Sequence, residues 1–205
     1  MLELNERGHT VKQVEEACIM LKNYGFETGL QMMTGLYGST DSDSLETAEK
    51  IIALAPDTVR IYPTVVIKGT KLHTLAEKGE FFPSGVEEAV DLCAKLIPMF
   101  ENAGIKVIRV GLHSGGGVED GFAGGAYHPA LRELCEGRIY YNSALGKLEK
   151  LGKGSYILAV NKREISKMTG QKKQNLLKLK SLGFDCSVEG REDLEKYEIE
   201  AVKVR

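Results

Sequence analysis

The feature that most constrains the fold is a short stretch, residues 29–46, with the composition of a buried strand, a glycine-broken turn and a helix start. Leu30 to Met33 are apolar except for Gln31, and a polar side chain inside a strand needs a partner or a ligand. Gly35 and Gly38 allow the backbone to turn tightly after the strand. Because α/β proteins bind ligands where a strand ends in a glycine loop before a helix, we expect a binding site here.

The helix after this turn is expected over residues 42–54, with Ser42 or Ser44 as its N-terminal cap. Glu46 and Glu49 add acidic side chains near its start, where the helix dipole favours negative charge.

Residues 10–110 alternate between helical and strand patterns. The expected helices cover 10–24, 42–54, 72–78 and 84–103, and the expected strands cover 26–33, 58–62 and 105–110. Such alternation predicts the α/β class, with parallel strands and helices packed outside them. Thr10 is the expected cap of the first helix and Ser84 that of the last, which Pro98 should kink or split.

From residue 111 to residue 127 seven of seventeen residues are glycine, which predicts a loop with high backbone entropy. Beyond it we expect a small α+β appendage, opening with a helix over 127–151 that is interrupted near Gly137 and Gly146. Its other elements are expected as strands at 155–160, 184–188 and 199–204 and as helices at 162–168 and 172–182.

The composition is that of an ordinary globular protein: 205 residues, of which 42% are hydrophobic and 27% charged. No apolar run approaches the roughly 20 residues that span a bilayer, and the acidic start lacks the basic region of a signal peptide. We therefore expect a cytoplasmic protein with no membrane partner. The four cysteines are scattered, without metal-ligand spacing or a disulfide framework, so no metal site is predicted.

Four ordered motifs carry a resemblance that covers nearly the whole chain. They are Leu4-Asn-Glu-Arg-Gly-His-Thr, Gly29-Leu-Gln-Met-Met-Thr-Gly-Leu-Tyr-Gly, Val59-Arg-Ile-Tyr-Pro-Thr-Val-Val-Ile-Lys-Gly-Thr and Tyr127-His-Pro-Ala-Leu-Arg-Glu-Leu. The sequence resembles the elongator-type radical SAM proteins and their coproporphyrinogen-oxidase-like relatives, a family of Fe-S oxidoreductases. It departs from that family at Tyr37, where the family has proline.

The resemblance implies that residues 1–126 are the C-terminal half of the radical SAM partial (β/α)6 TIM-like barrel and that residues 127–205 are its C-terminal α+β domain. In the intact family an iron-sulfur cluster reduces S-adenosylmethionine (SAM), and the resulting deoxyadenosyl radical abstracts hydrogen from a substrate. The family's Cys-x3-Cys-x2-Cys cluster motif belongs to an N-terminal half that is missing here. The chain is therefore expected to be a fragment that binds no cluster and is inactive alone, and we assign no catalytic residue.

The resemblance also implies part of a SAM-binding site. Arg7 matches the arginine that meets the methionyl carboxylate, Gln31 matches the polar position that faces the ribose, and Gly35 lies in the loop after that strand. Without the resemblance, Arg7 reads as a solvated surface arginine and Gln31 as a hydrogen-bonded residue of the barrel interior.

Tyr62, Thr64 and Val65 match the next strand end, which lies under the adenine in the family, although a tyrosine at such a position is more often part of a core. His113 follows the third strand, where a parallel sheet presents ligand groups, and we include it among the candidate cofactor-binding residues. A surface histidine is the alternative interpretation.

The segment 147–180 has a net charge of +8, in contrast to the chain's overall net charge of −2. Its strand-helix-glycine-helix-strand order is similar to a KH-like RNA-binding unit, in which Lys172 and Lys173, after Gly170, would grip phosphates. Binding of tRNA or another RNA is therefore an alternative function, and a solvated lysine face is the competing interpretation.

A half barrel would leave its first strand without a neighbour, exposing backbone groups and apolar side chains. We therefore also expect a homo-oligomer that covers this edge.

Overall fold

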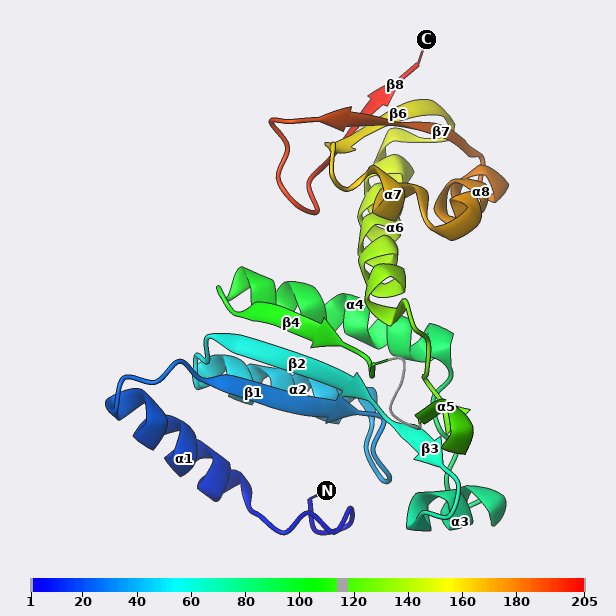
Figure 1. Ribbon diagram of the computed structural model, residues 1–205. Coiled ribbons are helices and arrows are strands. Elements are labelled where there is room, and N and C mark those ends of the chain that lie inside the picture. Colours follow the sequence, from blue (N-terminus) through cyan, green and yellow to red (C-terminus); the bar gives the residue numbers. More distant parts are fainter. Residues whose placement is uncertain (1, 114–117, 205) are drawn as a thin grey trace. The chain divides into compact units, whose positions relative to one another are not determined.

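The computed structural model describes residues 2–113 and 118–204 of the chain (Figure 1). The chain divides into two compact units, Met1–Leu131 and Arg132–Arg205, and each is described by itself. Among the described residues, no helix is both long enough and apolar enough to cross a membrane.

The first unit is built on a parallel sheet of three strands in the order β1-β2-β4. The strands are β1 (Gly29–Thr34), β2 (Thr58–Pro63) and β4 (Lys106–Val110), and the main helices are α1 (Val11–Asn23), α2 (Asp41–Ala53), α3 (Lys71–Glu77) and α4 (Val86–Asn102). Helices α2 and α4 cover one face of the sheet, and the other face has no covering helix among the described residues of this unit (Figure 1). The predicted α/β class and the parallel strands are thus confirmed.

Alternate residues of the strands fill the core between the sheet and these helices. Val59 and Ile61 of β2 are fully buried, as are Leu96, Ile97 and Phe100 of α4. Successive side chains of a strand point to opposite faces. Thr58, Arg60 and Tyr62, which alternate with Val59 and Ile61 along β2, therefore belong to the uncovered face.

The helix caps are only partly as expected. Thr10 caps α1, as predicted, but α2 is capped by Thr40, not by Ser42 or Ser44. Thr40 is extended and its hydroxyl accepts a hydrogen bond from the backbone N–H of Asp43, while the Asp43 carboxylate accepts one from the backbone N–H of Thr40. This reciprocal capping box satisfies two free N–H groups at once, which a single serine cap cannot do.

Helix α4 begins after Gly85 instead of after Ser84, because the Glu88 carboxylate accepts a hydrogen bond from the Gly85 N–H at 2.7 Å. The helix is continuous through Pro98, so the expected split is wrong. Burial of most of its apolar residues offsets the hydrogen bond that proline removes.

Strand β1 begins three residues later than expected. Phe26 is exposed and its N–H donates to Leu21 at the end of α1, so it still belongs to the helix terminus. Thr28 precedes the strand, with its N–H donating to the Asp57 carboxylate at 2.6 Å.

Part of the expected glycine loop forms regular structure. A short helix, α5 (Val118–Gly121), leads into β5 (Phe122–Gly125), which pairs antiparallel with β3 (Val65–Ile67). At Gly125 the φ angle is +99°, and an added Cβ would lie 2.7 Å from the Thr64 carbonyl oxygen. The glycine therefore permits a close strand approach, which composition alone does not distinguish from a loop. Residues 114–117 of the expected loop lie outside the described residues.

The second unit has a three-stranded sheet in the order β7-β6-β8, in which β6 is parallel to β7 and antiparallel to β8. Its elements are β6 (Gly154–Asn161), α7 (Ile165–Thr169), the 3-10 turn η1 (Gln171–Lys173), α8 (Gln174–Ser181), β7 (Phe184–Arg191) and β8 (Ile199–Lys203). The sheet packs on residues of α6 (Leu131–Leu151), around a core that includes Tyr140, Leu148, Tyr156 and Leu158.

Helix α6 starts four residues later than expected and is continuous through both glycines, so the predicted interruptions are wrong. At Gly137 an added Cβ would lie 3.3 Å from the Lys167 carbonyl oxygen, so this glycine allows α7 to approach the helix closely. Glycine costs a helix only about 1 kcal/mol, and the packing of Tyr140, Ala144 and Leu148 outweighs that cost.

Candidate functional site: the uncovered face of the first sheet

The uncovered sheet face carries a row of polar side chains. In the register of the strands Gln31 is paired with Arg60, and Arg60 is paired with Arg109 across a bulge in β2 and β4. Neighbouring strands are about 4.8 Å apart, so the three side chains start from adjacent positions. Gln31 is exposed and the two arginines are half-buried.

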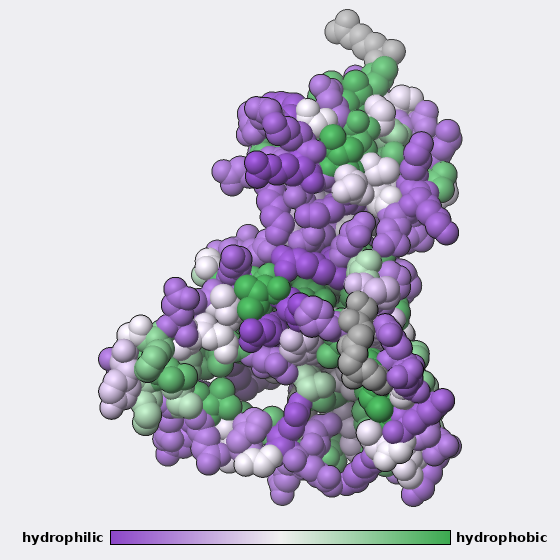
Figure 2. Space-filling model, in the orientation of Figure 1, coloured by the Kyte–Doolittle hydropathy of each residue, from purple (hydrophilic) through white to green (hydrophobic). Residues whose placement is uncertain are grey.

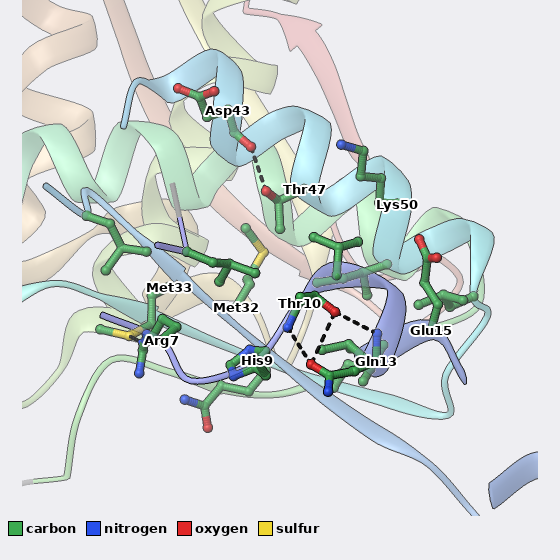
Figure 3. Close-up of a pocket in the computed structure, with 18 of the residues that line it drawn as sticks. Arg7, His9, Thr10, Gln13, Glu15, Met32, Met33, Asp43, Thr47 and Lys50 are labelled. Carbon is green, nitrogen blue, oxygen red and sulfur yellow. Dashed lines mark hydrogen bonds between the residues drawn. The ribbon is translucent and has the colours of Figure 1, made fainter. Parts of the chain in front are cut away.

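Arg7 reaches the same face from the segment before α1. Its Nη2 atom lies against the sulfur of Met33 (Figure 3), and Met33 is paired in register with Tyr62. Two of the residues predicted to bind SAM, Gln31 and Tyr62, therefore lie on one face, and Arg7 contacts their neighbour Met33.

Beside this face a groove of about 960 Å³ runs between the N-terminal segment with α1, the free edge of β1, and α2 (Figure 3). The space-filling view shows the molecule hollowed between α1 and the sheet (Figure 2). The walls combine apolar residues such as Leu30, Met32 and Ile51 with the polar side chains of Arg7 and Gln31.

The rim of the groove also contains acidic groups. The Thr40 hydroxyl and backbone N–H donate to Asp43 and hold the pKa of its carboxyl below the usual range. That carboxylate stays charged at neutral pH and completes the capping box of α2. Glu3, Glu15 and Glu46 line the same groove from the N-terminal segment, α1 and α2.

The residues expected under the adenine lie where β2 ends. Thr64 is buried, and its backbone N–H and its hydroxyl both donate to the Thr34 carbonyl, at 2.9 and 2.8 Å. Its side chain therefore joins the ends of β1 and β2. Val65 opens β3 opposite Gly125. Gly35 has φ +67°, a left-handed conformation that fits the tight turn expected after β1.

His113 is exposed at the end of the described segment that follows β4. No hydrogen bond or ion pair within the described residues joins it to Arg7 or Gln31. Its cofactor-binding role stays a prediction.

Arg60 and Arg109 were missed by sequence reasoning. The signal was present, since polar residues alternate with the buried Val59 and Ile61 along β2. For Arg109 no such alternation exists, because the bulge shifts its register against Arg60.

In the second unit, Lys172 and Lys173 are both exposed and adopt left-handed backbone conformations, with φ of +50° and +61°. Non-glycine residues seldom do so. The buried amide of Asn175 secures the turn by donating to the carbonyl oxygens of Gly137 and Met168, at 2.9 and 3.0 Å.

The cysteines do not form a metal site. Cys18, Cys93 and Cys135 are buried in separate elements and Cys186 lies in β7. Within residues 2–113 and 118–204, no group of three or more His, Cys, Asp or Glu is arranged to hold a metal ion.

The comparisons with known proteins find similarities to parts of the chain. Residues 56–141 match the Radical_SAM C-terminal domain. Over 95 residues the chain is 35% identical to the tRNA uridine(34) acetyltransferase of Methanocaldococcus infernus, covering 45% of this chain and 18% of that protein. The protein of the same name from Dehalococcoides mccartyi is 34% identical over 84 residues, covering 40% of this chain and 18% of the relative. Elongator complex protein 3 of Homo sapiens is 32% identical over 96 residues, which cover 45% of this chain and 18% of that protein.

These matches confirm the resemblance to the elongator-type radical SAM proteins that the sequence indicates. The chain spans only about 18% of the length of these relatives. The matched segment contains β2 and β4 with Arg60, Tyr62 and Arg109, whereas Arg7 and Gln31 precede it.

Proposed function

We propose that the chain is the C-terminal part of an elongator-type radical SAM protein. Residues 1–126 would form the C-terminal half of its partial (β/α)6 TIM-like barrel, and residues 127–205 its C-terminal α+β domain. The observation that carries this proposal is the uncovered face of a parallel sheet that overlaps the Radical_SAM C-terminal match. A barrel cut in half would have such a face, because the inner surface of a barrel has no helices.

The uncovered face would hold part of SAM. Arg7 would pair with the methionyl carboxylate, since guanidinium and carboxylate form strong charge-assisted hydrogen bonds. Gln31 has an amide without a partner among the described residues and would bind the ribose hydroxyls. The turn at Gly35 and the strand end at Tyr62, Thr64 and Val65 would border the adenine. In a complete protein SAM supplies the radical chemistry.

An iron-sulfur cluster does not fit the described residues, because three thiolates must surround one cluster and the cysteines here lie in separate elements. We therefore expect the chain alone to be inactive and to need ligands from a missing N-terminal half. Reconstitution with iron and sulfide under anaerobic conditions should give neither stoichiometric iron nor 5′-deoxyadenosine. Detection of both products would overturn this expectation.

The partial site predicts weak SAM binding. We expect calorimetry to give a dissociation constant above roughly 100 μM, because few contacts anchor the ligand. Arg7→Ala should weaken it further, whereas Arg163→Ala, an exposed change in the second unit, is the matched control. Micromolar binding that Arg7→Ala leaves unchanged would show that SAM binds elsewhere.

The relatives named tRNA uridine(34) acetyltransferase suggest that the complete protein acts on tRNA. A second candidate function is therefore RNA binding by the basic segment 147–180. It is favoured by the exposure of Lys172 and Lys173 in a turn held by buried hydrogen bonds.

If this segment binds RNA, the logarithm of the binding constant should fall linearly with the logarithm of the salt concentration, by roughly 0.7 per phosphate contacted. Joint replacement of Lys172 and Lys173 by alanine should lower affinity for unrelated sequences alike and reduce the slope by about one to two units. A double variant that binds tRNA like the parent would leave the lysines as a solvated face.

A further inference from the structure

The two arginines at the centre of the uncovered face are not explained by the packing of the first unit. Arg60 and Arg109 are paired in register on adjacent strands, and like charges in such positions repel each other. Neither has a hydrogen bond or an ion pair with another residue in the described part of the chain. Both are half-buried, so water reaches them less freely than it reaches surface arginines.

The charged residues of the three strands are all of one sign. Lys106, paired in register with Thr58, starts from the same face one step before the arginines, and Arg7 lies over Met33. None of the three strands contains an aspartate or a glutamate. The acidic residues of the neighbouring groove come from the N-terminal segment, α1 and α2, not from the sheet.

The backbone leaves room for the Arg60 side chain. An added Cβ at Gly29 would lie 2.8 Å from Thr58 Oγ1 and 3.9 Å from Arg60 Nη1. The guanidinium of Arg60 therefore extends across the bare backbone of β1, toward the start of the strands. Gln31, next on the same face of β1, adds an amide that can donate without bringing negative charge.

Arg60 and Arg109 start from paired positions on adjacent strands, and two guanidinium groups on one face suit an anion with several oxygens. Each presents a planar fork that binds phosphate oxygens bidentately. The single carboxylate of SAM needs only one guanidinium group, and Arg7 is already placed to bind it. A diphosphate or two successive phosphates would neutralise the pair and remove the repulsion that the free face carries.

We infer that the uncovered sheet face binds a phosphate-bearing ligand through Arg60 and Arg109, with Gln31 and Lys106 at its border. The ligand differs from SAM, so this site would exist even if SAM did not bind. The phosphates would belong either to a small diphosphate or to an RNA backbone.

The test is isothermal titration of the full chain with sodium pyrophosphate, adenosine diphosphate and a single-stranded RNA of twelve nucleotides, all without SAM. Arg60→Gln and Arg109→Gln should each weaken pyrophosphate binding at least about tenfold, because each removes a charge-assisted bidentate contact. Arg60→Lys keeps the charge but not the planar fork. Its affinity for pyrophosphate should therefore lie between those of the parent and of Arg60→Gln. Lys95→Gln, an exposed change on α4, is the control, and circular dichroism verifies that each variant folds.

The outcomes separate the sources of the phosphate. Loss of both pyrophosphate and RNA binding in the arginine variants would support an RNA backbone, whereas loss of pyrophosphate and adenosine diphosphate alone would support a small diphosphate. The inference is overturned if the parent binds none of the three up to about 10 mM, or if the variants bind as the parent does. It is also overturned if a separate titration with SAM shows that the arginine variants lose only SAM binding, since the arginines would then serve the SAM site.

Discussion

A buried ionic cluster in the second unit should control its stability. Lys167 Nζ lies 2.9 Å from Glu136 Oε2 and 2.8 Å from Glu164 Oε2, and the two carboxylates are only 6% and 12% exposed. Replacement of Lys167 by methionine would leave two acidic groups facing each other without the cation between them. Breaking a buried pair in this way costs several kcal/mol, and because the lysine is 22% exposed we expect about 2–4 kcal/mol at pH 7.

The loss should depend on pH. Burial alone would raise the pKa of Glu136, but the hydrogen bond and the charge of Lys167, with Arg132 and Lys196, hold that pKa below the usual range. A lowered carboxyl pKa contributes stability that is present above the unfolded-state pKa and is lost as the pH falls through the folded-state pKa. Burial would lower the pKa of Lys167, yet its bonds to Glu164 and Glu136 raise it, so its contribution is complete at neutral pH and is lost only in strong alkali.

The assay is urea denaturation of the full chain, read by hydrogen exchange in peptides of β6, because the two units need not unfold together. Lys180→Met is the matched control, since the 3.2 Å pair of Lys180 with Asp185 is exposed on both sides. Such a pair is worth about 0–1 kcal/mol. The reasoning would be refuted if Lys167→Met lost less unfolding free energy than the control. It would also be refuted if that loss were the same at pH 7 and at pH 4.

Three further predictions concern the first unit. Thr40→Ala should destabilise it by about 0.5–2 kcal/mol in urea denaturation, while Ser42→Ala should not, because only Thr40 caps α2. Gly125→Ala should raise hydrogen exchange across β3 and β5, since its φ of +99° and the 2.7 Å approach to Thr64 leave no room for a Cβ; unchanged exchange would contradict the close packing. Light scattering should detect a homodimer or larger assembly that covers the free edge of β1, and a monodisperse monomer would speak against it.

Much of the first unit could be predicted from its sequence because its signals are local. The periodicity of α2 and α4 and the short apolar runs of the strands depend on neighbouring residues. These local patterns predict the α/β class and the parallel direction of the strands. The pairing of β3 with β5 could not be predicted in this way. It joins residues far apart in the chain, and one partner contains the glycines that composition assigns to a loop.

In the candidate site, too, some residues are identified by local sequence and others only by strand pairing. Gln31 was identifiable as a polar residue within an apolar run, and the resemblance added Arg7 and Tyr62. Arg60 and Arg109 become a pair only through the register of β2 and β4, and that register includes a bulge. A bulge changes which residues share a face, so the sequence alone leaves the position of Arg109 ambiguous.

The uncovered face and the free edge of β1 also account for α1, whose pattern is otherwise puzzling. Its apolar spacing predicts an amphipathic helix, yet Cys18 is the only buried residue in it, and Ile19, Met20 and Tyr24 are more than half exposed. An amphipathic helix derives most of its stability from packing its apolar face, and in the described part of the chain α1 lacks the neighbour that its sequence predicts. The free edge of β1 borders the same groove and also has no second paired strand among the described residues. One added strand and helix, from a missing N-terminal half or from a second copy, would satisfy both, and the cationic face would then line an enclosed site instead of an open surface.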